Sequence, residues 1–176
     1  MQKIKIGVIG CGNISNAYFN ACKKFPILDL TACADLDLER ARAKATEHGM
    51  SRACITKELL ADPEIQIVVN LTVPKVHAEV DLAVLQAGKS VHSEKPLALS
   101  RDDGAAVLQT ASARKLRVGC APDTFLGGGI QTCVKLINDG WIGKPVTATA
   151  FMLGHGPEGW HPAPLPLGLM PGYLDE

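Results

Sequence analysis

The sequence lacks an excess of either charge, because 18 Lys and Arg residues balance 18 Asp and Glu residues. Proteins that bind nucleic-acid backbones or anionic lipid usually carry a positive field, so both kinds of partner are disfavoured. No apolar run reaches the roughly 18 residues that a membrane span requires. Gly7 and Gly10 interrupt the apolar N-terminal segment before a signal-type core forms. We therefore expect a soluble, cytoplasmic protein with no nucleic-acid partner and no membrane partner.

Cysteine pairs of the C-x-x-C type are also missing. The six cysteines lie mostly inside apolar runs, where a thiol behaves as a small hydrophobic group. This pattern favours buried, reduced thiols, with a disulfide or a metal site as the alternative. His155 and His161 have no cysteine or carboxylate frame around them, so we expect no metal site. The G-K-[ST] sequence of a P-loop is absent as well.

The sequence does contain short apolar runs that alternate with segments of helical period. This alternation is typical of a parallel sheet with both faces covered, so we predict an α/β fold with a doubly wound parallel sheet. The predicted strands cover 4–10, 27–34, 65–72, 90–94 and 116–122. The predicted helices cover 14–25, 37–49, 56–62, 74–87, 101–114 and 129–140.

Several residues mark the ends of these helices. Asp37 is a predicted N-cap and Gly49 a predicted helix stop, while Ser100 and Asp103 form a predicted capping box. The helix that begins at Pro74 carries a predicted buried stripe of Val76, Val80, Ala83, Val84 and Ala87.

The segment GVIGCGNIS contains a glycine pattern between a predicted strand and a predicted helix. Gly10, Gly12 and Ser15 occupy the G-x-G-x-x-G/A frame, with serine in place of the usual third glycine or alanine. The first glycine permits a tight turn, the second lets the backbone approach a pyrophosphate, and helix amides then face the anion. The candidate cofactor residues in this loop are Gly10, Cys11, Gly12, Asn13 and Ile14. A glycine turn that only joins strand to helix is the alternative.

An acidic residue stands where a dinucleotide site needs one. Asp35 ends the second predicted strand, twenty residues after Ser15, where its carboxylate can accept hydrogen bonds from the adenosine ribose. A carboxylate there repels a 2′-phosphate, so NAD is favoured over NADP, although Arg40 softens this preference. An aspartate that only begins the next helix is the alternative.

Three motifs in this order resemble those of the Gfo/Idh/MocA oxidoreductases, the family of glucose–fructose oxidoreductase and inositol dehydrogenase. They are the glycine loop, NLTVPKVH at 70–77 and EKP at 94–96, and the resemblance covers about residues 3–161. It implies an NAD(P)-binding Rossmann domain, here residues 1–122, followed by a larger α/β substrate domain. Full-length relatives are often homo-oligomers.

The resemblance also assigns roles to particular residues. It places Leu71, Thr72, Pro74, His77, Glu94 and Lys95 against the cofactor. Lys95 becomes the catalytic residue, which holds the substrate oxygen or relays its proton, and its bond to Pro96 is cis. The residues support a structural histidine equally well at His77, which lies beside Val76 and Val80. If the resemblance holds, we expect burial beside an oxidised nicotinamide to lower the pKa of Lys95 and Glu94 to oppose that shift.

The last third of the chain departs from the family pattern. Residues 123–176 are expected to hold a connecting helix, a strand at 144–153 with one wet face, and a tail rich in proline and glycine at 154–176. Relatives continue here into the substrate domain. We therefore expect a truncated or frame-shifted gene, or a fragment, that retains mainly the cofactor half.

These observations predict an NAD(P)-dependent dehydrogenase. The expected reaction transfers hydride between the nicotinamide and a secondary alcohol of a sugar, polyol or related small molecule. A non-catalytic nucleotide-sensing module is one alternative. An S-adenosylmethionine methyltransferase is another, because it also uses a glycine loop and a strand-end acid.

Overall fold

The computed structural model describes residues 3–151 and 153 of the chain. The chain divides after Pro122 into two compact units, Met1–Pro122 and Asp123–Glu176. The predicted proline- and glycine-rich tail, with His155 and His161, lies outside the described residues.

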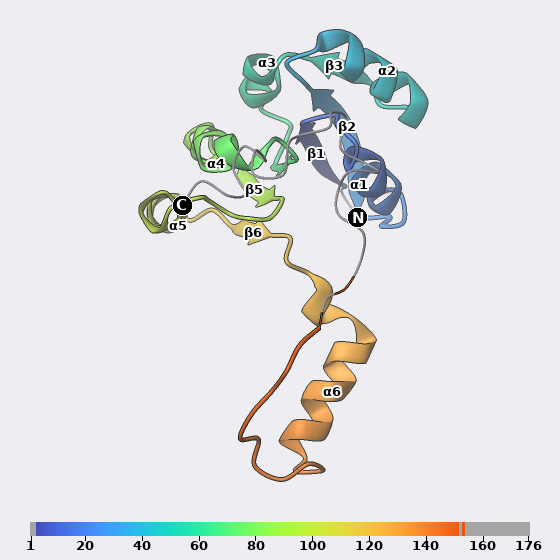
Figure 1. The fold of residues 1–176 in the computed structure, drawn as a ribbon. Coiled ribbons are helices and arrows are strands. Elements are labelled where there is room, and N and C mark those ends of the chain that lie inside the picture. The colour runs from blue at the N-terminus through green and yellow to red at the C-terminus, as the bar shows by residue number, and fades with distance from the viewer. Residues whose placement is uncertain (1–2, 152, 154–176) are drawn as a thin grey trace. The chain divides into compact units, whose positions relative to one another are not determined.

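The first unit is built on a six-stranded sheet in which all neighbouring strands run parallel (Figure 1). The spatial order is β3-β2-β1-β4-β5-β6, so the direction of winding reverses between β1 and β4. This order defines a doubly wound sheet, which confirms the predicted fold class. The strands are β1 (Ile4–Ile9), β2 (Leu28–Ala34), β3 (Arg52–Cys54), β4 (Ile67–Asn70), β5 (Ser90–Ser93) and β6 (Val118–Cys120).

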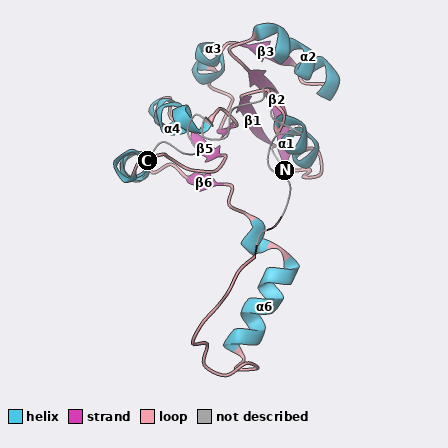
Figure 2. Ribbon diagram, in the orientation of Figure 1, coloured by secondary structure: helices cyan, strands magenta, loops and turns pink. Residues whose placement is uncertain are grey.

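Helices connect successive strands of the first unit (Figure 2). They are α1 (Ser15–Cys22), α2 (Leu38–His48), α3 (Thr56–Ala61), α4 (His77–Gln86) and α5 (Arg101–Arg114), with a 3-10 turn η1 (Pro74–Val76) before α4. No helix within the described residues is both long enough and apolar enough to cross a membrane.

Two buried clusters pack on the sheet. Val68 and Val69 are neighbours in β4 but belong to different clusters, because successive strand residues point to opposite faces. One cluster joins the sheet to α3, α4 and α5 through Leu59, Val84, Leu85, Val107 and Ala111. The other joins it to α1 and α2 through Phe19, Ala41 and Ala45. Both faces are therefore covered, as the continuous apolar strands predict.

The predicted helix ends are confirmed. The Asp37 carboxylate accepts hydrogen bonds from two amides in the first turn of α2, and Gly49 ends that helix with a φ of 69°. Ser100 accepts a hydrogen bond from the Asp103 amide at 3.1 Å and donates one to the Asp103 carboxylate at 2.7 Å. These contacts span two to four residues, so the local sequence encodes them.

Strand β3 was not predicted. It has only three residues, Arg52–Cys54, which is too short for an apolar run or an alternation to be visible. The strand forms because β2 offers it a free edge, on which Ala34 pairs with Cys54 in parallel register.

The predicted stripe on α4 is confirmed in part: Val84 is buried and the half-buried Val80 packs against the same cluster, whereas Ala87 is exposed. The other buried residues of this helix are His77, Asp81 and Leu85. The physical reason for the difference is that two polar side chains, His77 and Asp81, find hydrogen-bonding partners in the interior.

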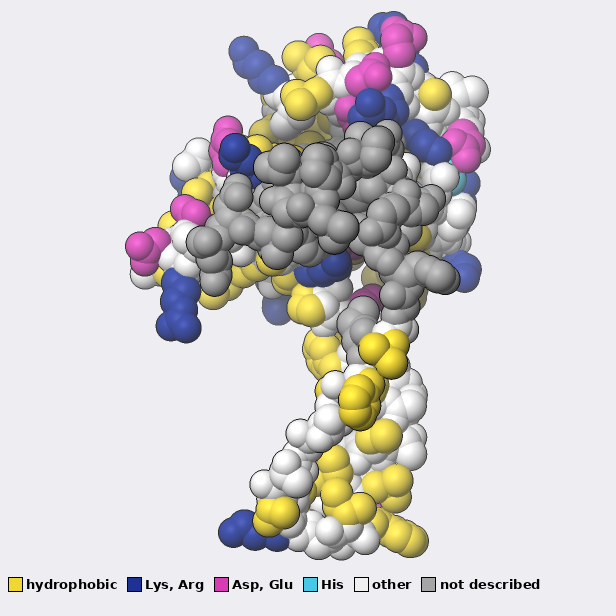
Figure 3. Space-filling view, in the orientation of Figure 1, with side chains coloured by type: hydrophobic (Ala, Val, Ile, Leu, Met, Phe, Trp, Pro, Cys, Tyr) yellow, Lys and Arg dark blue, Asp and Glu magenta, His cyan; other side chains and the backbone are white. Residues whose placement is uncertain are grey.

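The second unit contains a 3-10 turn η2 (Thr124–Leu126) and α6 (Gly128–Asn138), where a helix over 129–140 was predicted. Hydrophobic side chains of this unit are exposed, among them those of Ile130, Val134 and Trp141 (Figure 3). The predicted strand at 144–153 is not formed over 144–151. The described part of this unit has no other strand, and a strand needs a partner to satisfy its backbone groups.

All six cysteines are free thiols. Cys11, Cys33 and Cys54 are buried, as predicted, whereas Cys133 is exposed on α6.

Candidate cofactor site

The glycine loop follows β1 at the point where the winding of the sheet reverses. Gly10 has a φ of 101°, and a Cβ there would lie 2.6 Å from the Leu71 carbonyl. Both facts require glycine at this position. A Cβ at Gly12, by contrast, would meet no atom within 4 Å. The loop is thus tight on the protein side at Gly10 and open at Gly12, as a backbone surface for a pyrophosphate must be.

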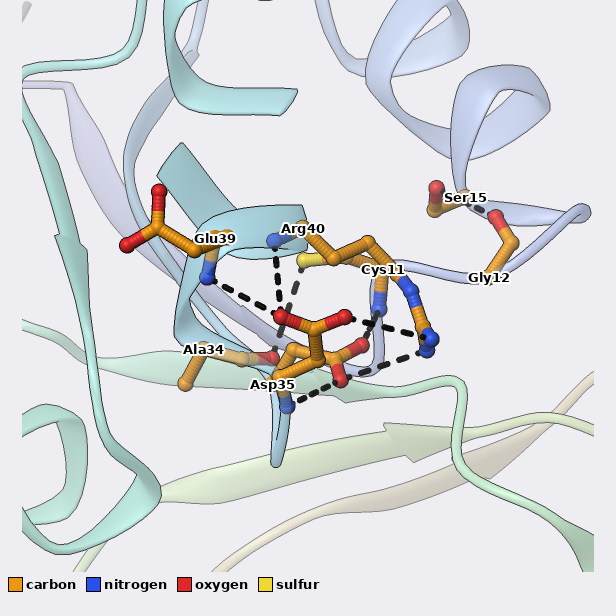
Figure 4. A network of polar contacts seen from close by, with 8 residues as sticks. Cys11, Gly12, Ser15, Ala34, Asp35, Glu39 and Arg40 are labelled. Carbon is orange, nitrogen blue, oxygen red and sulfur yellow. Dashed lines mark hydrogen bonds and ion pairs between the residues drawn. The ribbon is translucent and has the colours of Figure 1, made fainter. Parts of the chain in front are cut away.

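Ser15 shows why the third position tolerates serine. Its side chain is fully buried at the start of α1, and its hydroxyl donates a hydrogen bond to the Gly12 carbonyl at 2.7 Å (Figure 4). The Ser15 amide donates to the same oxygen at 3.1 Å. The first turn of α1 contains no acidic residue that would oppose an anion.

Asp35 lies directly beside the glycine loop (Figure 4). One carboxylate oxygen accepts a hydrogen bond from the Cys11 amide at 2.8 Å, and the other accepts one from the Asp37 amide at 2.9 Å. The Asp35 side chain is 9% exposed, and the guanidinium of Arg40 approaches it at 3.4 Å. Arg40 is 52% exposed and also lies 3.5 Å from Asp37. The predicted acid and the predicted loop are therefore in contact.

The Cys11 side chain faces the interior. Its thiol approaches the Ala34 carbonyl at 3.7 Å, and a hydrogen bond with Cys33 together with burial raises the pKa of this thiol. Cys11 therefore contributes its amide to the site, through the bond to Asp35.

A cavity of about 470 Å³ opens next to this contact, at the carboxyl ends of β1, β2 and β4. Among the predicted residues, Gly10, Gly12, Asp35, Leu71 and Thr72 line it. The other lining residues were not predicted from the sequence; they are Ile9, Leu36, Thr56, Val73, Val76, Glu79 and Val80. Apolar walls with a few polar groups at the edge suit an aromatic base linked to a sugar.

Pro74 and His77 do not line this cavity. His77 is buried, and its two ring nitrogens lie 2.6 Å from the Pro96 carbonyl and 2.9 Å from the Thr72 carbonyl. Both nitrogens are thus occupied by backbone atoms, as the structural alternative for this histidine requires. His77 connects the loop after β4 with the segment after β5.

Asn70 supports the same loop and was not singled out in the sequence. Its side-chain oxygen accepts hydrogen bonds from the amide and the hydroxyl of Thr72, at 3.1 and 2.6 Å. Its amide nitrogen donates to Asp81 at 2.7 Å and to the His77 carbonyl at 3.1 Å. The buried residues Asn70, His77 and Asp81 therefore hold Thr72 in place.

Glu94 and Lys95 follow β5 directly. The Glu94 amide donates to the Asn70 carbonyl at 2.8 Å, which continues the pairing of β5 with β4. Lys95 is exposed, Glu94 is half-buried, and the bond from Lys95 to Pro96 is cis, as the resemblance implies. Tyr18 of α1 donates a hydrogen bond to the Glu94 carboxylate at 2.8 Å. No short-range pattern marks that pair, because the two residues lie 76 positions apart.

The remaining loop residues, Asn13 and Ile14, are exposed between Gly12 and the start of α1. Within the described residues, no group of three or more His, Cys, Asp or Glu side chains has the geometry of a metal site.

The reversed winding, the open glycine loop and the strand-end acid define a dinucleotide-binding domain of the Rossmann type. The chain belongs to the Gfo/Idh/MocA family: a model of this family, described as an oxidoreductase family with an NAD-binding Rossmann fold, matches residues 4–121. The match confirms that the three motifs are those of this family. Because the family consists of oxidoreductases, the methyltransferase alternative is wrong.

Two curated relatives have names that indicate a sugar or polyol substrate. The 1,5-anhydro-D-fructose reductase of Ensifer adhaerens is 27% identical over 158 residues, which are 88% of this chain and 47% of that enzyme. The inositol 2-dehydrogenase/D-chiro-inositol 3-dehydrogenase of Lactiplantibacillus plantarum is 29% identical over 152 residues, 81% of this chain and 42% of that enzyme. The chain thus spans less than half the length of these relatives.

Two solved structures share the fold. The WlbA dehydrogenase from Bordetella pertussis, in complex with NADH and UDP-GlcNAcA, has a TM-score of 0.75 and 26% identity, covering 79% of this chain and 40% of that one. KijD10, a 3-ketoreductase from Actinomadura kijaniata in complex with NADP and TDP-benzene, has a TM-score of 0.75 and 25% identity. The match covers 79% of this chain and 43% of that one. One of these two complexes contains NADH and the other NADP.

Proposed function

We propose that this chain is the nucleotide-binding part of an oxidoreductase that transfers hydride between NAD and a secondary alcohol of a sugar, polyol or related small molecule. The observation that carries the proposal is the contact between the glycine loop and Asp35 at the edge of the cavity. A bound nicotinamide nucleotide supplies the hydride acceptor or donor, and every other contribution comes from the protein.

The loop residues Gly10, Gly12, Asn13 and Ile14 hold the pyrophosphate through the backbone, and the Cys11 amide orients Asp35. The carboxylate of Asp35 accepts hydrogen bonds from the adenosine ribose. The Asp37 amide and the Arg40 guanidinium donate to Oδ1, whereas Oδ2 accepts from the Cys11 amide and keeps a second lone pair for the sugar. The proposed contacts on the other side of the nucleotide come from Leu71, Thr72, Pro74, His77, Glu94 and Lys95.

NAD is the proposed cofactor in preference to NADP. The charges around Asp35 support this preference. The Arg40 guanidinium lies 3.4 Å from the Asp35 carboxylate and 3.5 Å from the Asp37 carboxylate. Two carboxylates next to one guanidinium leave a net negative site, which repels a 2′-phosphate. Arg40 moderates the repulsion, so we expect a preference and no absolute exclusion.

Lys95 is the proposed catalytic residue. It follows β5 at the carboxyl edge of the sheet, where doubly wound folds bind their ligands, and its side chain is exposed. An ammonium there donates a hydrogen bond to the substrate oxygen and exchanges its proton as the oxygen changes between alcohol and carbonyl.

The free thiols agree with a proposed cytoplasmic location, and homo-oligomers are proposed for the full-length protein.

The direct test is a fluorescence titration of the purified chain with NADH and with NADPH. We expect saturable binding, with a Kd for NADH about tenfold lower than that for NADPH because of the net negative site. The variant Asp35→Asn should weaken NADH binding and reduce the discrimination. The control Asp29→Asn changes an aspartate near the amino end of β2, whereas Asp35 follows its carboxyl end, and it should change neither value. A folded wild-type chain that binds neither nucleotide contradicts the proposal.

A non-catalytic nucleotide-sensing module is the second candidate, because every proposed site residue lies in the nucleotide-binding unit Met1–Pro122. Both candidates predict NADH binding, so Lys95→Ala in a chain extended by a substrate domain separates them. The enzyme loses turnover in this variant and keeps most of its NADH affinity. A sensing module shows no turnover with or without Lys95.

A further inference from the structure

Glu94 is held by two hydrogen bonds, one on each carboxylate oxygen. Oε1 accepts from the Tyr18 hydroxyl at 2.8 Å, and Oε2 accepts from the Lys95 amide at 2.9 Å. The second bond closes a small ring between the side chain of Glu94 and the peptide that leads to Lys95. The direction of the Glu94 carboxylate and the position of the Lys95 amide are therefore coupled.

Tyr18 reaches this carboxylate from the helix that follows the glycine loop. It lies one turn into α1, is half-buried, and its ring approaches the ring of His92 in β5 with centroids 6.3 Å apart. Its neighbour Phe19 is fully buried in the core, so the backbone at Tyr18 is firmly anchored. A hydrogen bond from a neutral hydroxyl to a carboxylate is charge-assisted and directional.

The bond joins two parts of the sheet that are not adjacent. The strand before α1 is β1, and β4 separates β1 from β5, which ends at Ser93, immediately before Glu94. The proposed pyrophosphate site is at the start of α1, and the proposed reacting segment follows β5. Tyr18 is thus a direct side-chain link between the phosphate-binding helix and the segment that carries Lys95.

We propose that Tyr18 is a positioning residue for the nicotinamide end of the site: it fixes the Glu94 carboxylate and, through the Lys95 amide, the segment that carries the catalytic lysine. This inference rests on the proposed function. The adenosine end does not depend on Tyr18, because Asp35 is held by the Cys11 and Asp37 amides.

The variant Tyr18→Phe tests the assignment, since it removes one oxygen and keeps the ring. We expect the Kd for NADH to rise on the order of tenfold, because the segment from Glu94 to Lys95 is no longer held in place before the nucleotide binds. The Kd for ADP-ribose, which lacks the nicotinamide, should stay within about twofold of the wild-type value, because the adenosine end of the site does not depend on Tyr18. In the chain without nucleotide, the Lys95 amide should exchange its hydrogen faster, because the Glu94 carboxylate is no longer fixed.

Two further variants make the result specific. Glu94→Ala should weaken NADH binding by itself, and Tyr18→Phe should add little to it, because the two residues act as a pair. Ser51→Ala removes a hydroxyl with a 2.8 Å hydrogen bond to the Thr31 carbonyl, before the amino end of β3, and should change none of the measurements.

The outcomes separate the two proposals. Equal losses for NADH and ADP-ribose would mean that Tyr18 supports α1 as a whole, and this would overturn its assignment to the nicotinamide end. Unchanged NADH affinity and unchanged exchange at Lys95 would overturn it as well. A folded wild-type chain that binds neither ligand overturns the proposed function, and the inference is lost with it.

Discussion

Asp81 is fully buried in α4, close to the loop that carries Thr72. Its Oδ1 accepts a hydrogen bond from Asn70 at 2.7 Å, whereas its Oδ2 has no hydrogen-bond partner among the described residues. Burial raises the pKa of Asp81, and the hydrogen bond from Asn70 opposes that shift. A buried carboxylate that is only half satisfied makes this position sensitive to pH.

The sign of that sensitivity follows from the raised pKa of Asp81. The folded chain binds more protons than the unfolded chain between pH 3.8 and the higher folded value, so this residue reduces stability as pH rises through the window. We expect Asp81→Asn to increase the free energy of unfolding at neutral pH by about 1–2 kcal/mol, because an amide carries no buried charge. Urea unfolding at several pH values measures the change.

Asp62 provides a control of the opposite sign. The Glu64 amide and Arg52 lower its pKa, so its contribution to stability is present above the unfolded pKa and is lost as pH falls through the lowered folded value. Asp62→Asn should therefore decrease stability at neutral pH. If both aspartate variants shifted stability in the same direction, it would be wrong that Asp81 has a raised pKa and a carboxylate oxygen without a hydrogen bond.

At the scale of elements, His77 joins two connections at the carboxyl edge of the sheet. Its ring contacts the Thr72 carbonyl in the loop after β4 and the Pro96 carbonyl in the segment after β5. Removing the ring takes away the group that both carbonyls approach in a buried region. The two connections that border the proposed site then lose their common support.

We expect His77→Ala to lower the free energy of unfolding by about 2–4 kcal/mol, because buried polar groups lose their partners. Urea unfolding measures the loss, and hydrogen exchange should locate the new flexibility in residues 72–76 and 94–97. Gln86→Ala, at the exposed end of the same helix, is the control and should have a small effect. A small effect of His77→Ala would show that the two carbonyls do not depend on the ring.

At the scale of the whole molecule, the buried hydrophobic residues of the described chain lie between Ile6 and Ala111, within the first unit. The described residues of the second unit are exposed throughout. Hydrophobic burial is the main source of folding free energy. The first unit therefore contains the interactions that make it fold.

We expect a chain that ends at Pro122 to unfold cooperatively, with a urea midpoint close to that of the whole chain. It should bind NADH with a Kd within about twofold of the full value, since the proposed cofactor contacts all precede Pro122. The whole chain, treated in parallel, is the reference. A shortened chain that is unfolded, or that binds NADH much more weakly, would show that residues after Pro122 support the site.

Much of the fold was predictable because its signals are local. Asp37, Gly49 and Ser100 act on residues within four positions, and Gly10 is required by its own backbone angle. The apolar strands identified the doubly wound class because a sheet covered on both faces needs no polar alternation. Strand β3 was missed because three residues carry too little pattern.

The order of residues was therefore enough to specify the helix ends, the main strands, the glycine loop and the acid that accompanies it, since each depends on a short segment. The three-dimensional packing decided the rest: the link from Tyr18 to Glu94, the placement of His77 between two backbone carbonyls, and the burial of Asp81. These contacts join side chains from different strands and helices. Their energies depend on distance and desolvation, which exist only after the sheet and its helices have assembled.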